Sequence, residues 1–147
     1  MKKLLVAVDG SEHANAAVRF AARLHKECGG CEVHLLTAEP APREWQTRGM
    51  EPEAIRSHLR FLAHETSAGA RAILDGQGVP HTTHLEFGDP AQAIVAEAEK
   101  LGCDLVVMGT RGLGALGGLL LGSVAQRRHL LRSRLGRHVL VTSHSHP

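Results

Sequence analysis

The stretch Leu4-Leu-Val-Ala-Val-Asp-Gly-Ser11 decides the fold class of this 147-residue chain. Its first five residues form a continuous apolar run, the pattern of a strand that is buried on both faces of a sheet. The run stops at Asp9-Gly10, a pair typical of turns, and Ser11 is a preferred residue for capping the start of a helix. The stretch therefore predicts a buried strand that leads directly into a helix.

The same alternation continues along the chain. Further strands are predicted over Cys31 to Ala38, His81 to Phe87, Leu105 to Met108 and His138 to Thr142. Helices are predicted from Ser11 up to Gly29-Gly30, from Glu51 to Asp75, from Asp89 to Leu101 and from Ser123 onward. Five strands that alternate with four helices predict an α/β fold: one doubly wound domain over residues 1–147, with a five-stranded parallel sheet, helices on both faces and a flexible tail at 143–147.

Composition narrows the function classes. The chain has 43% hydrophobic and 22% charged residues, close to the average globular domain, which excludes disordered, collagen-like and fibrous classes. Only 3% of the residues are aromatic, which argues against nucleic-acid binding through stacked rings. No acidic residue follows Asp104, whereas six arginines do, so this end of the chain favours anions.

The apolar runs are too short for export or membrane insertion. The N-terminal run stops at Asp9, short of a secretory signal, and Leu113 to Leu121 has about half the length needed to cross a bilayer. Three cysteines, an odd number, fit a reducing compartment better than a disulfide framework. We expect a soluble, cytoplasmic protein with no membrane partner.

A glycine-rich loop follows the fourth predicted strand, with glycines at 109, 112, 114, 117, 118 and 122. Such a loop lets the backbone approach a ligand closely, and Gly122-Ser123 would offer amides and a hydroxyl at a helix N-terminus, which together predict a phosphate cradle. A P-loop needs Lys before the Ser, where this chain has Gly122, and the glycines do not continue into a Rossmann dinucleotide motif. Ligands of parallel sheets bind at the carboxyl ends of the strands, where this loop begins.

From Gly109 to Ser123 the chain fits Gly-x-x-Gly, nine residues, then Gly-Ser, and this pattern resembles the nucleotide-binding signature of the universal stress proteins. The resemblance extends over nearly the whole chain. It includes the opening Leu4 to Ser11, the strand Val33 to Leu36, the turn Gly88-Asp89-Pro90-Ala91 with Ile94, and the run Asp104 to Gly112.

The resemblance implies ATP, or AMP or ADP, as the ligand, with Mg²⁺ held through the phosphates, on a Rossmann-like, adenine nucleotide alpha hydrolase-like fold that forms homodimers. It places Asp9 and Gly10 by the adenosine, the backbone of Ala38 at the adenine edge, Gly109 and Gly112 along the ribose and phosphates, and Gly122, Ser123 and Val124 around the phosphates. Arg111, Arg127 and Arg128 are candidate phosphate contacts. The loop itself supports only the phosphate part, and the identity of the base rests on the resemblance alone.

The chain departs from the family pattern after Gly122-Ser123. Family members have an amphipathic helix there and a short connection containing Pro, whereas this connection is longer and lacks Pro. A helical stripe of Val124, Leu131 and Leu135 would include Arg128, so Arg128 either snorkels, reaches a phosphate or marks a kink. The departure bears on dimerisation, because the last strand pairs across the dimer in this family.

Several motifs also have simpler interpretations. Asp9 could act only as a turn and cap residue, the glycine-rich loop could be a flexible surface loop, and the C-terminal arginines are better read as a solvated helix face than as a nucleic-acid site. Cys28-Gly-Gly-Cys31 has the spacing of a redox pair or half a zinc site. It falls at a helix C-terminus, which disfavours thiolate, so we expect neither role and no metal site.

The leading hypothesis is a cytoplasmic adenine-nucleotide-binding stress-response protein that acts as a sensor or regulator. It is not chiefly an enzyme, because no general base is placed by the sequence, and any ATP hydrolysis should be slow. One alternative is an interaction module without nucleotide, whose basic C-terminal helix docks on an acidic protein partner. Another is a hydrolase using Asp9 and Ser123, for which no partner His can be assigned to the Ser.

Overall fold

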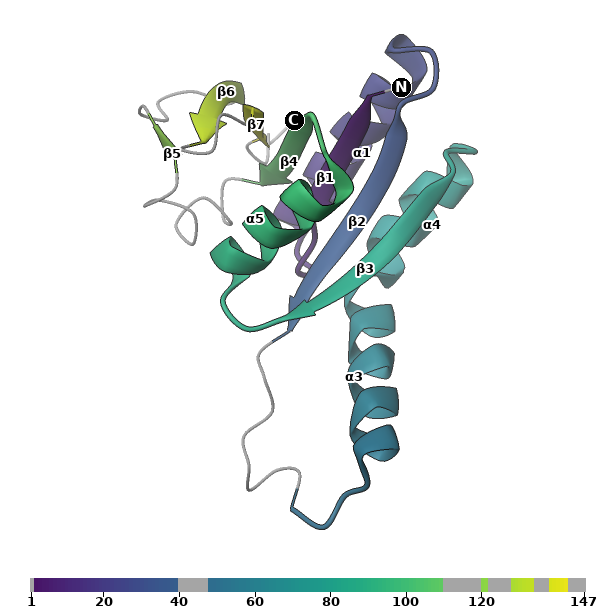
Figure 1. Cartoon of the computed structure of the whole chain (residues 1–147). Coiled ribbons are helices and arrows are strands. Elements are labelled where there is room, and N and C mark those ends of the chain that lie inside the picture. Colours follow the sequence, from purple (N-terminus) through teal and green to yellow (C-terminus); the bar gives the residue numbers. More distant parts are fainter. Residues whose placement is uncertain (1, 40–47, 110–119, 122–127, 134–137, 143–147) are drawn as a thin grey trace.

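A computed structural model describes residues 2–39, 48–109, 120–121, 128–133 and 138–142 of the chain (Figure 1). The described strands form one sheet in the order β3-β2-β1-β4-β7-β6-β5. Their bounds are β1 Lys3–Ala7, β2 Glu32–Glu39, β3 His81–Phe87, β4 Leu105–Gly109, β5 Leu120–Leu121, β6 Arg128–Ser133 and β7 His138–Thr142. The first five strands in the spatial order run parallel, which confirms the predicted α/β fold with its parallel sheet.

Strand β1 lies in the middle of the parallel part, between β2 and β4. The chain builds outward from β1 to β2 and β3, then returns to the other side of β1 to form β4. The strand order therefore reverses between β1 and β4. In open parallel sheets this reversal leaves a crevice at the carboxyl ends of the strands.

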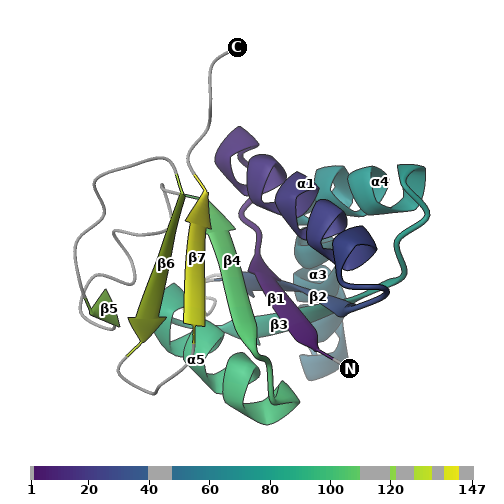
Figure 2. The same cartoon turned by 90° about the horizontal axis from the view of Figure 1, so that it is seen from above.

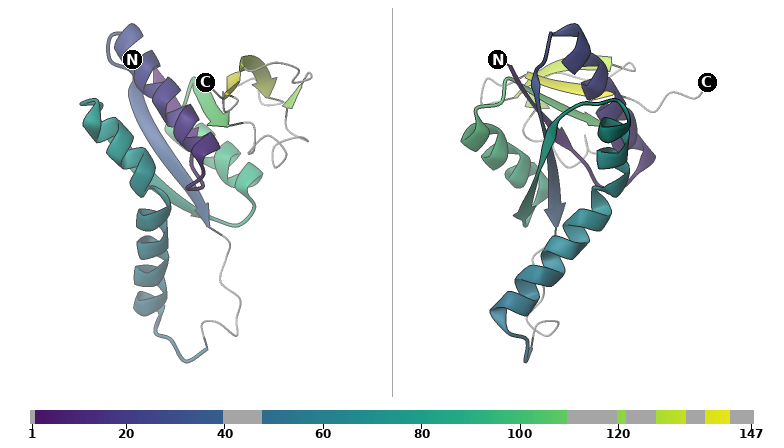
Figure 3. Two further views of the ribbon diagram at one scale, coloured as in Figure 1. Left: turned by 180° about the vertical axis from the view of Figure 1, so that it is seen from behind. Right: turned by 90° about the vertical axis from the view of Figure 1, so that its right-hand side faces the viewer.

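Helices cover both faces of the sheet, as predicted (Figures 2 and 3). Helices α1 (Glu12–Glu27) and α4 (Ala68–Gly76) pack on one face, and α5 (Pro90–Leu101) packs on the other. Apolar positions explain both contacts: Val18 and Ala21 of α1 and Leu74 of α4 are fully buried in one core cluster, while Ile94 of α5 is buried in the second. Helix α3 (Pro52–Thr66) extends beyond the sheet.

The single helix predicted from Glu51 to Asp75 is two helices, α3 and α4, with a break at Ser67. The Ser67 hydroxyl is fully buried and donates a hydrogen bond to the carbonyl of Ala63 at 2.9 Å. A hydroxyl that bonds back to a carbonyl four residues earlier bends a helix. The prediction of one continuous helix was wrong because the apolar spacing does not register this local competition.

The C-terminal helix predicted from Ser123 is also corrected, because residues 128–133 form strand β6. This strand pairs antiparallel with β7, and only four residues separate the two, a length common in β-hairpins. The helical reading placed Arg128 on the buried stripe, so a helix could not have presented a clean apolar face. As a strand, the same segment supplies backbone partners to the outer edge of β7. Arg128 opens β6 rather than lying within a helix.

The segment predicted as a glycine-rich loop contains one further short strand, β5, which pairs with β6. Residues 110–119 and 122–127 lie outside the described residues, as does the predicted tail at 143–147. In the part of the chain that the structure describes, no helix has the length and apolar character needed to span a bilayer. The extent of the single domain stays a prediction.

Candidate functional site

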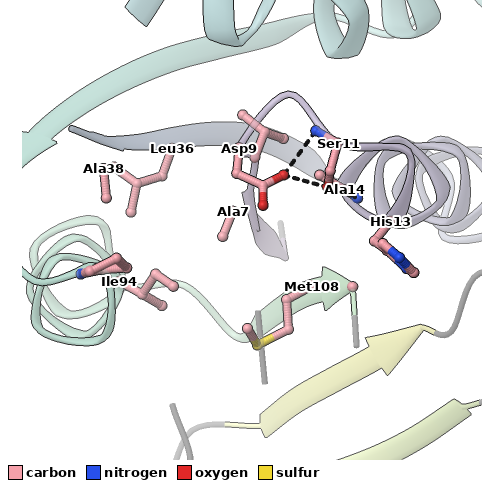
Figure 4. Close-up of a pocket in the computed structure, with 12 residues that line it drawn as sticks. Ala7, Asp9, Ser11, His13, Ala14, Leu36, Ala38, Ile94 and Met108 are labelled. Atoms are coloured by element: carbon pink, nitrogen blue, oxygen red, sulfur yellow. Dashed lines mark hydrogen bonds between the residues drawn. The ribbon is translucent and has the colours of Figure 1, made fainter. Parts of the chain in front are cut away.

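A cavity of about 230 Å³ opens at the carboxyl ends of β1, β2 and β4, at the reversal of strand order (Figure 4). The first turns of α1 and α5 flank it, because both helices start where these strands end. Its lining combines backbone, small apolar side chains and one carboxylate. The lining residues are Ala7, Val8, Asp9, Ser11, His13, Ala14, Leu36, Ala38, Pro90, Ile94, Met108 and Gly109.

Asp9 is the acidic residue in this lining, and its position is held by the start of α1. Its Oδ1 accepts hydrogen bonds from the backbone N–H of Ser11, at 2.9 Å, and from the Ser11 hydroxyl. The Ser11 hydroxyl in turn accepts from the N–H of Ala14 at 3.2 Å, which caps α1. Gly10 makes the turn possible with φ of +83°, a conformation that side chains disfavour. Asp9 therefore has the predicted turn role, and its exposed carboxylate also faces the cavity.

The backbone of Ala38 is presented at the edge of the cavity because β2 is longer than β1. The register of the two strands ends at Ala7 and Leu36, and the Leu36 carbonyl accepts from the N–H of Val8 at 2.9 Å. Backbone groups alternate in direction along a strand, so the N–H and C=O of Ala38 point to the same side as those of Leu36. Because β1 has already ended at this level, no described strand pairs with the N–H and C=O of Ala38 on that side, and a ligand can reach them.

Gly109 ends β4 directly beneath the first turn of α1. A Cβ at this position would lie 2.6 Å from the carbonyl oxygen of His13, closer than any side chain tolerates. Only glycine allows α1 and β4 to approach so closely at the rim of the cavity. Packing of α1 against β4 therefore requires glycine at position 109, the first glycine of the loop, whether or not a ligand binds.

The structure brings three of the predicted site residues, Asp9, Ala38 and Gly109, into one cavity lining. Gly10 forms the adjacent turn without lining the cavity. The predicted phosphate residues Gly112, Gly122, Ser123 and Val124, with Arg111 and Arg127, lie outside the described residues. Arg128 begins β6.

Sequence analysis missed several lining residues, notably His13 and Met108. His13 lies four residues after Asp9, in the first turn of α1. Its place shortly after the end of a strand was the signal that could have predicted it as a lining residue. Pro90 is the first residue of α5. Asp89 caps this helix, because its Oδ2 accepts a hydrogen bond from the N–H of Gln92 at 3.1 Å. Met108 carried no distinguishing signal, because it reads as one more buried residue of β4.

A polar cluster lies beside the cavity, between α5 and strands β2 and β3. Nδ1 of His34 lies 2.9 Å from Nε2 of His84, and Nδ1 of His84 lies 3.8 Å from Oε2 of Glu97. Because Nε2 of His34 faces the Glu32 carboxylate at 3.3 Å and donates to it, His34 Nδ1 accepts from His84. Glu97 is only 2% exposed, which is unusual for a glutamate.

These close contacts shift the pKa values of His84 and Glu86. Burial, together with the neighbouring His34 and Lys100, lowers the pKa of His84, so His84 resists taking up a proton. A hydrogen bond with Glu97, together with burial and the charge of Glu97, raises the pKa of Glu86. The neighbouring Glu97 therefore makes the ionisation of Glu86 less favourable.

Comparison with known proteins identifies the family. The model of the universal stress protein family matches residues 1–128. The chain belongs to the universal stress protein family. A universal stress protein of Thermus aquaticus is 38% identical over 128 residues, which cover 86% of this chain and 89% of that relative. The family match ends at Arg128, where β6 begins and close to the departure seen in the sequence.

Solved structures of the family share the fold. The universal stress protein from Archaeoglobus fulgidus in complex with dAMP is 25% identical, with a TM-score of 0.58 over 78% of this chain and 86% of that one. A family protein from Arabidopsis thaliana with AMP bound is 19% identical, with a TM-score of 0.56 over 80% of this chain and 82% of that one. The second likeness concerns the fold alone.

Proposed function

We propose that this universal stress protein binds an adenine nucleotide in the cavity between α1 and α5 and acts as a sensor or regulator whose state depends on that nucleotide. The observation that carries the proposal is the convergence of Asp9, the open backbone edge of Ala38 and Gly109 on one cavity at the reversal of strand order. The dAMP complex of the Archaeoglobus fulgidus relative supports it.

The residues of the cavity fit an adenosine. Small and apolar side chains, among them Ala7 and Ile94, provide surfaces for a flat base. The N–H and C=O of Ala38 offer one donor and one acceptor to the edge of the base, and the Asp9 carboxylate offers acceptors to hydroxyl or amino groups. In this arrangement the phosphates extend from Gly109 toward the loop that follows, where ATP would carry Mg²⁺ through its phosphates.

Regulation rather than catalysis is the proposed role. The described lining holds Asp9, already engaged by Ser11, and His13 as its titratable side chains. We propose that ATP hydrolysis, if measured, stays far below the roughly 1 to 1,000 per second of ordinary enzymes. Nucleotide occupancy would then persist long enough to serve as a signal in the cytoplasm.

The decisive test is native mass spectrometry of the full chain, alone and with ATP and Mg²⁺ or with AMP. The expected result is a mass increase of one nucleotide per chain. A spectrum that neither nucleotide changes at millimolar concentration overturns the proposal and favours an interaction module without nucleotide. The basic helix proposed for such a module is absent over residues 128–133, which form β6.

Asp9→Asn sharpens this test, because the amide keeps an oxygen for Ser11 and removes only the charge. We expect a loss of roughly 10- to 100-fold in affinity for ATP or AMP, the effect of a hydrogen bond to a charged group, and no comparable loss for inorganic phosphate. Asp75→Asn is the matched control, because Asp75 is exposed and pairs with His81 away from the cavity. Equal losses for nucleotide and phosphate would remove the adenosine role of Asp9.

The same spectra report the oligomeric state. We propose a homodimer, as the family resemblance implies. In this chain, however, β6 pairs with the outer edge of β7. A dimer of this protein would therefore use a surface other than that edge of the last parallel strand.

A further inference from the structure

The turn between α1 and β2 holds two cysteines at the opposite end of the sheet from the nucleotide cavity. Cys28 is the C-terminal cap of α1, and Cys31 immediately precedes β2. Two glycines join them, with φ of +75° at Gly29 and +112° at Gly30, and a Cβ at either glycine would meet nothing within 4 Å. The glycines therefore serve to reverse the chain rather than to relieve crowding.

Local hydrogen bonds hold this reversal in place. Nδ1 of His25 donates to the carbonyl oxygen of Cys31 at 2.6 Å, and the N–H of Gly30 donates to the carbonyl of His25 at 2.9 Å. These bonds fix the backbone of the turn that joins the two cysteines.

The two thiols differ in exposure. Cys28 is exposed, whereas Cys31 is only 3% exposed. Both line a surface cavity of about 600 Å³ whose other lining residues are Lys2, Gly29, Gly30 and Asp104. A small oxidant can therefore reach Cys28, and Cys31 belongs to the lining of the same cavity.

We propose that Cys28 and Cys31 form a reversible dithiol–disulfide site, with Cys28 as the thiol attacked by hydrogen peroxide and Cys31 as the thiol that resolves it. This site is separate from nucleotide binding and does not depend on it. Among the described residues no group of three or more metal-ligating side chains forms, which favours redox chemistry over a zinc site at this turn.

The chemistry balances in two steps. The Cys28 thiolate attacks one peroxide oxygen, the O–O bond breaks, and the departing hydroxide takes up a proton as water, leaving a sulfenic acid on Cys28. The Cys31 sulfur then attacks the Cys28 sulfur, the S–S bond forms, the S–O bond breaks, and the hydroxyl leaves with the Cys31 proton as a second water. The two thiols lose two electrons and two protons, and peroxide is reduced to water. A small dithiol reverses the reaction by thiol–disulfide exchange.

The burial of Cys31 shapes the behaviour of this pair, because burial raises the pKa of the Cys31 thiol. Because a poorly stabilised thiolate is a poor leaving group, the disulfide once formed resists reduction. The position of Cys28 at the C-terminus of α1 argues against fast redox catalysis, not against a disulfide.

The test uses the full chain, reduced and then treated with hydrogen peroxide. Thiols are alkylated in denaturant and counted by intact mass. The expected result is three alkylated thiols before oxidation and one, Cys103, afterwards, with a mass loss of two hydrogens that dithiothreitol reverses. Cys103 is the internal control, because it is buried in the core beneath α5. Retention of three thiols, or a disulfide between two chains, overturns the proposal.

Two variants assign the roles. Cys31→Ser should accumulate a sulfenic acid on Cys28 that a 1,3-dione reagent traps, since the resolving thiol is gone. Cys28→Ser should retain both remaining thiols under the same treatment, because neither Cys31 nor Cys103 is exposed. Equal peroxide reactivity of the two variants would contradict the assignment of Cys28 as the attacked thiol.

Discussion

The two faces of the sheet differ in the kinds of side chain that they bury. Under α1 and α4 the buried side chains are apolar, and the buried polar groups on that side are the hydroxyls of Thr37 and Ser67. Under α5 the buried set includes two ionisable side chains, His34 and Glu97. The first face should depend on packing alone. On the second face the pKa of His84 is lowered and that of Glu86 is raised, so stability there should depend on pH.

The largest expected effect is a cavity in the apolar face. Leu74→Ala removes a fully buried side chain of α4, and we expect a loss of about 2 to 5 kcal/mol in the free energy of unfolding. Because the described residues of this cluster include no carboxyl group or histidine, the loss should be the same at pH 7.5 and pH 5.5. Urea unfolding at both pH values measures it. A loss that changes with pH would show that the two faces are not independent.

The next effect concerns the close approach of α1 to β4. Gly109→Ala places a methyl group 2.6 Å from the His13 carbonyl oxygen, and we expect a loss of about 1 to 3 kcal/mol together with weaker nucleotide binding. Gly76→Ala is the control, because a Cβ there meets nothing within 4 Å. Calorimetry of unfolding and of AMP binding checks both parts. Full stability in the Gly109 variant would mean that this glycine serves the ligand alone.

A smaller, pH-dependent effect is expected on the α5 face. The pKa of His84 is lowered from 6.5 in the folded protein, so as pH falls below about 6.5 the unfolded chain takes up a proton that the folded chain refuses. This residue therefore favours unfolding increasingly as pH falls through that window. His84→Gln should flatten the dependence of stability on pH between 7.5 and 5.5. Identical slopes for the wild type and the variant would contradict the shift.

The smallest effect has the opposite sign. The pKa of Glu86 is raised from 4.5, so the protonated form is favoured in the fold and stability is lost as pH rises through the raised pKa. Glu86→Gln should raise the midpoint of thermal unfolding slightly at pH 7, because Glu97 loses its charged neighbour, and should not raise it at pH 4. Glu99→Gln, on the exposed side of α5, is the control. A gain that persists at pH 4 would point to a cause other than charge.

Much of the parallel sheet was predictable. The strands His138–Thr142 and His81–Phe87 have the predicted bounds. The first was predicted from its apolar run and the second from its alternation of apolar and polar residues, and both are local signals. The segment Arg128–Ser133 was predicted wrongly, since its conformation depends on pairing with the neighbouring strand β7, which the helical spacing of its own side chains does not report. Glu97 was missed for a related reason. Its place beside His84 and Glu86 exists only once α5 lies over β2 and β3.

The sequence by itself determined the alternation of strands and helices, the turn at Asp9-Gly10 and the family signature from Gly109 to Ser123, because each depends on neighbours along the chain. The tertiary structure alone decided which of these residues meet. It ended β1 before β2 and so exposed the backbone of Ala38, and it set His13 against Gly109. Those contacts follow from packing between distant segments, and packing has no local pattern to read.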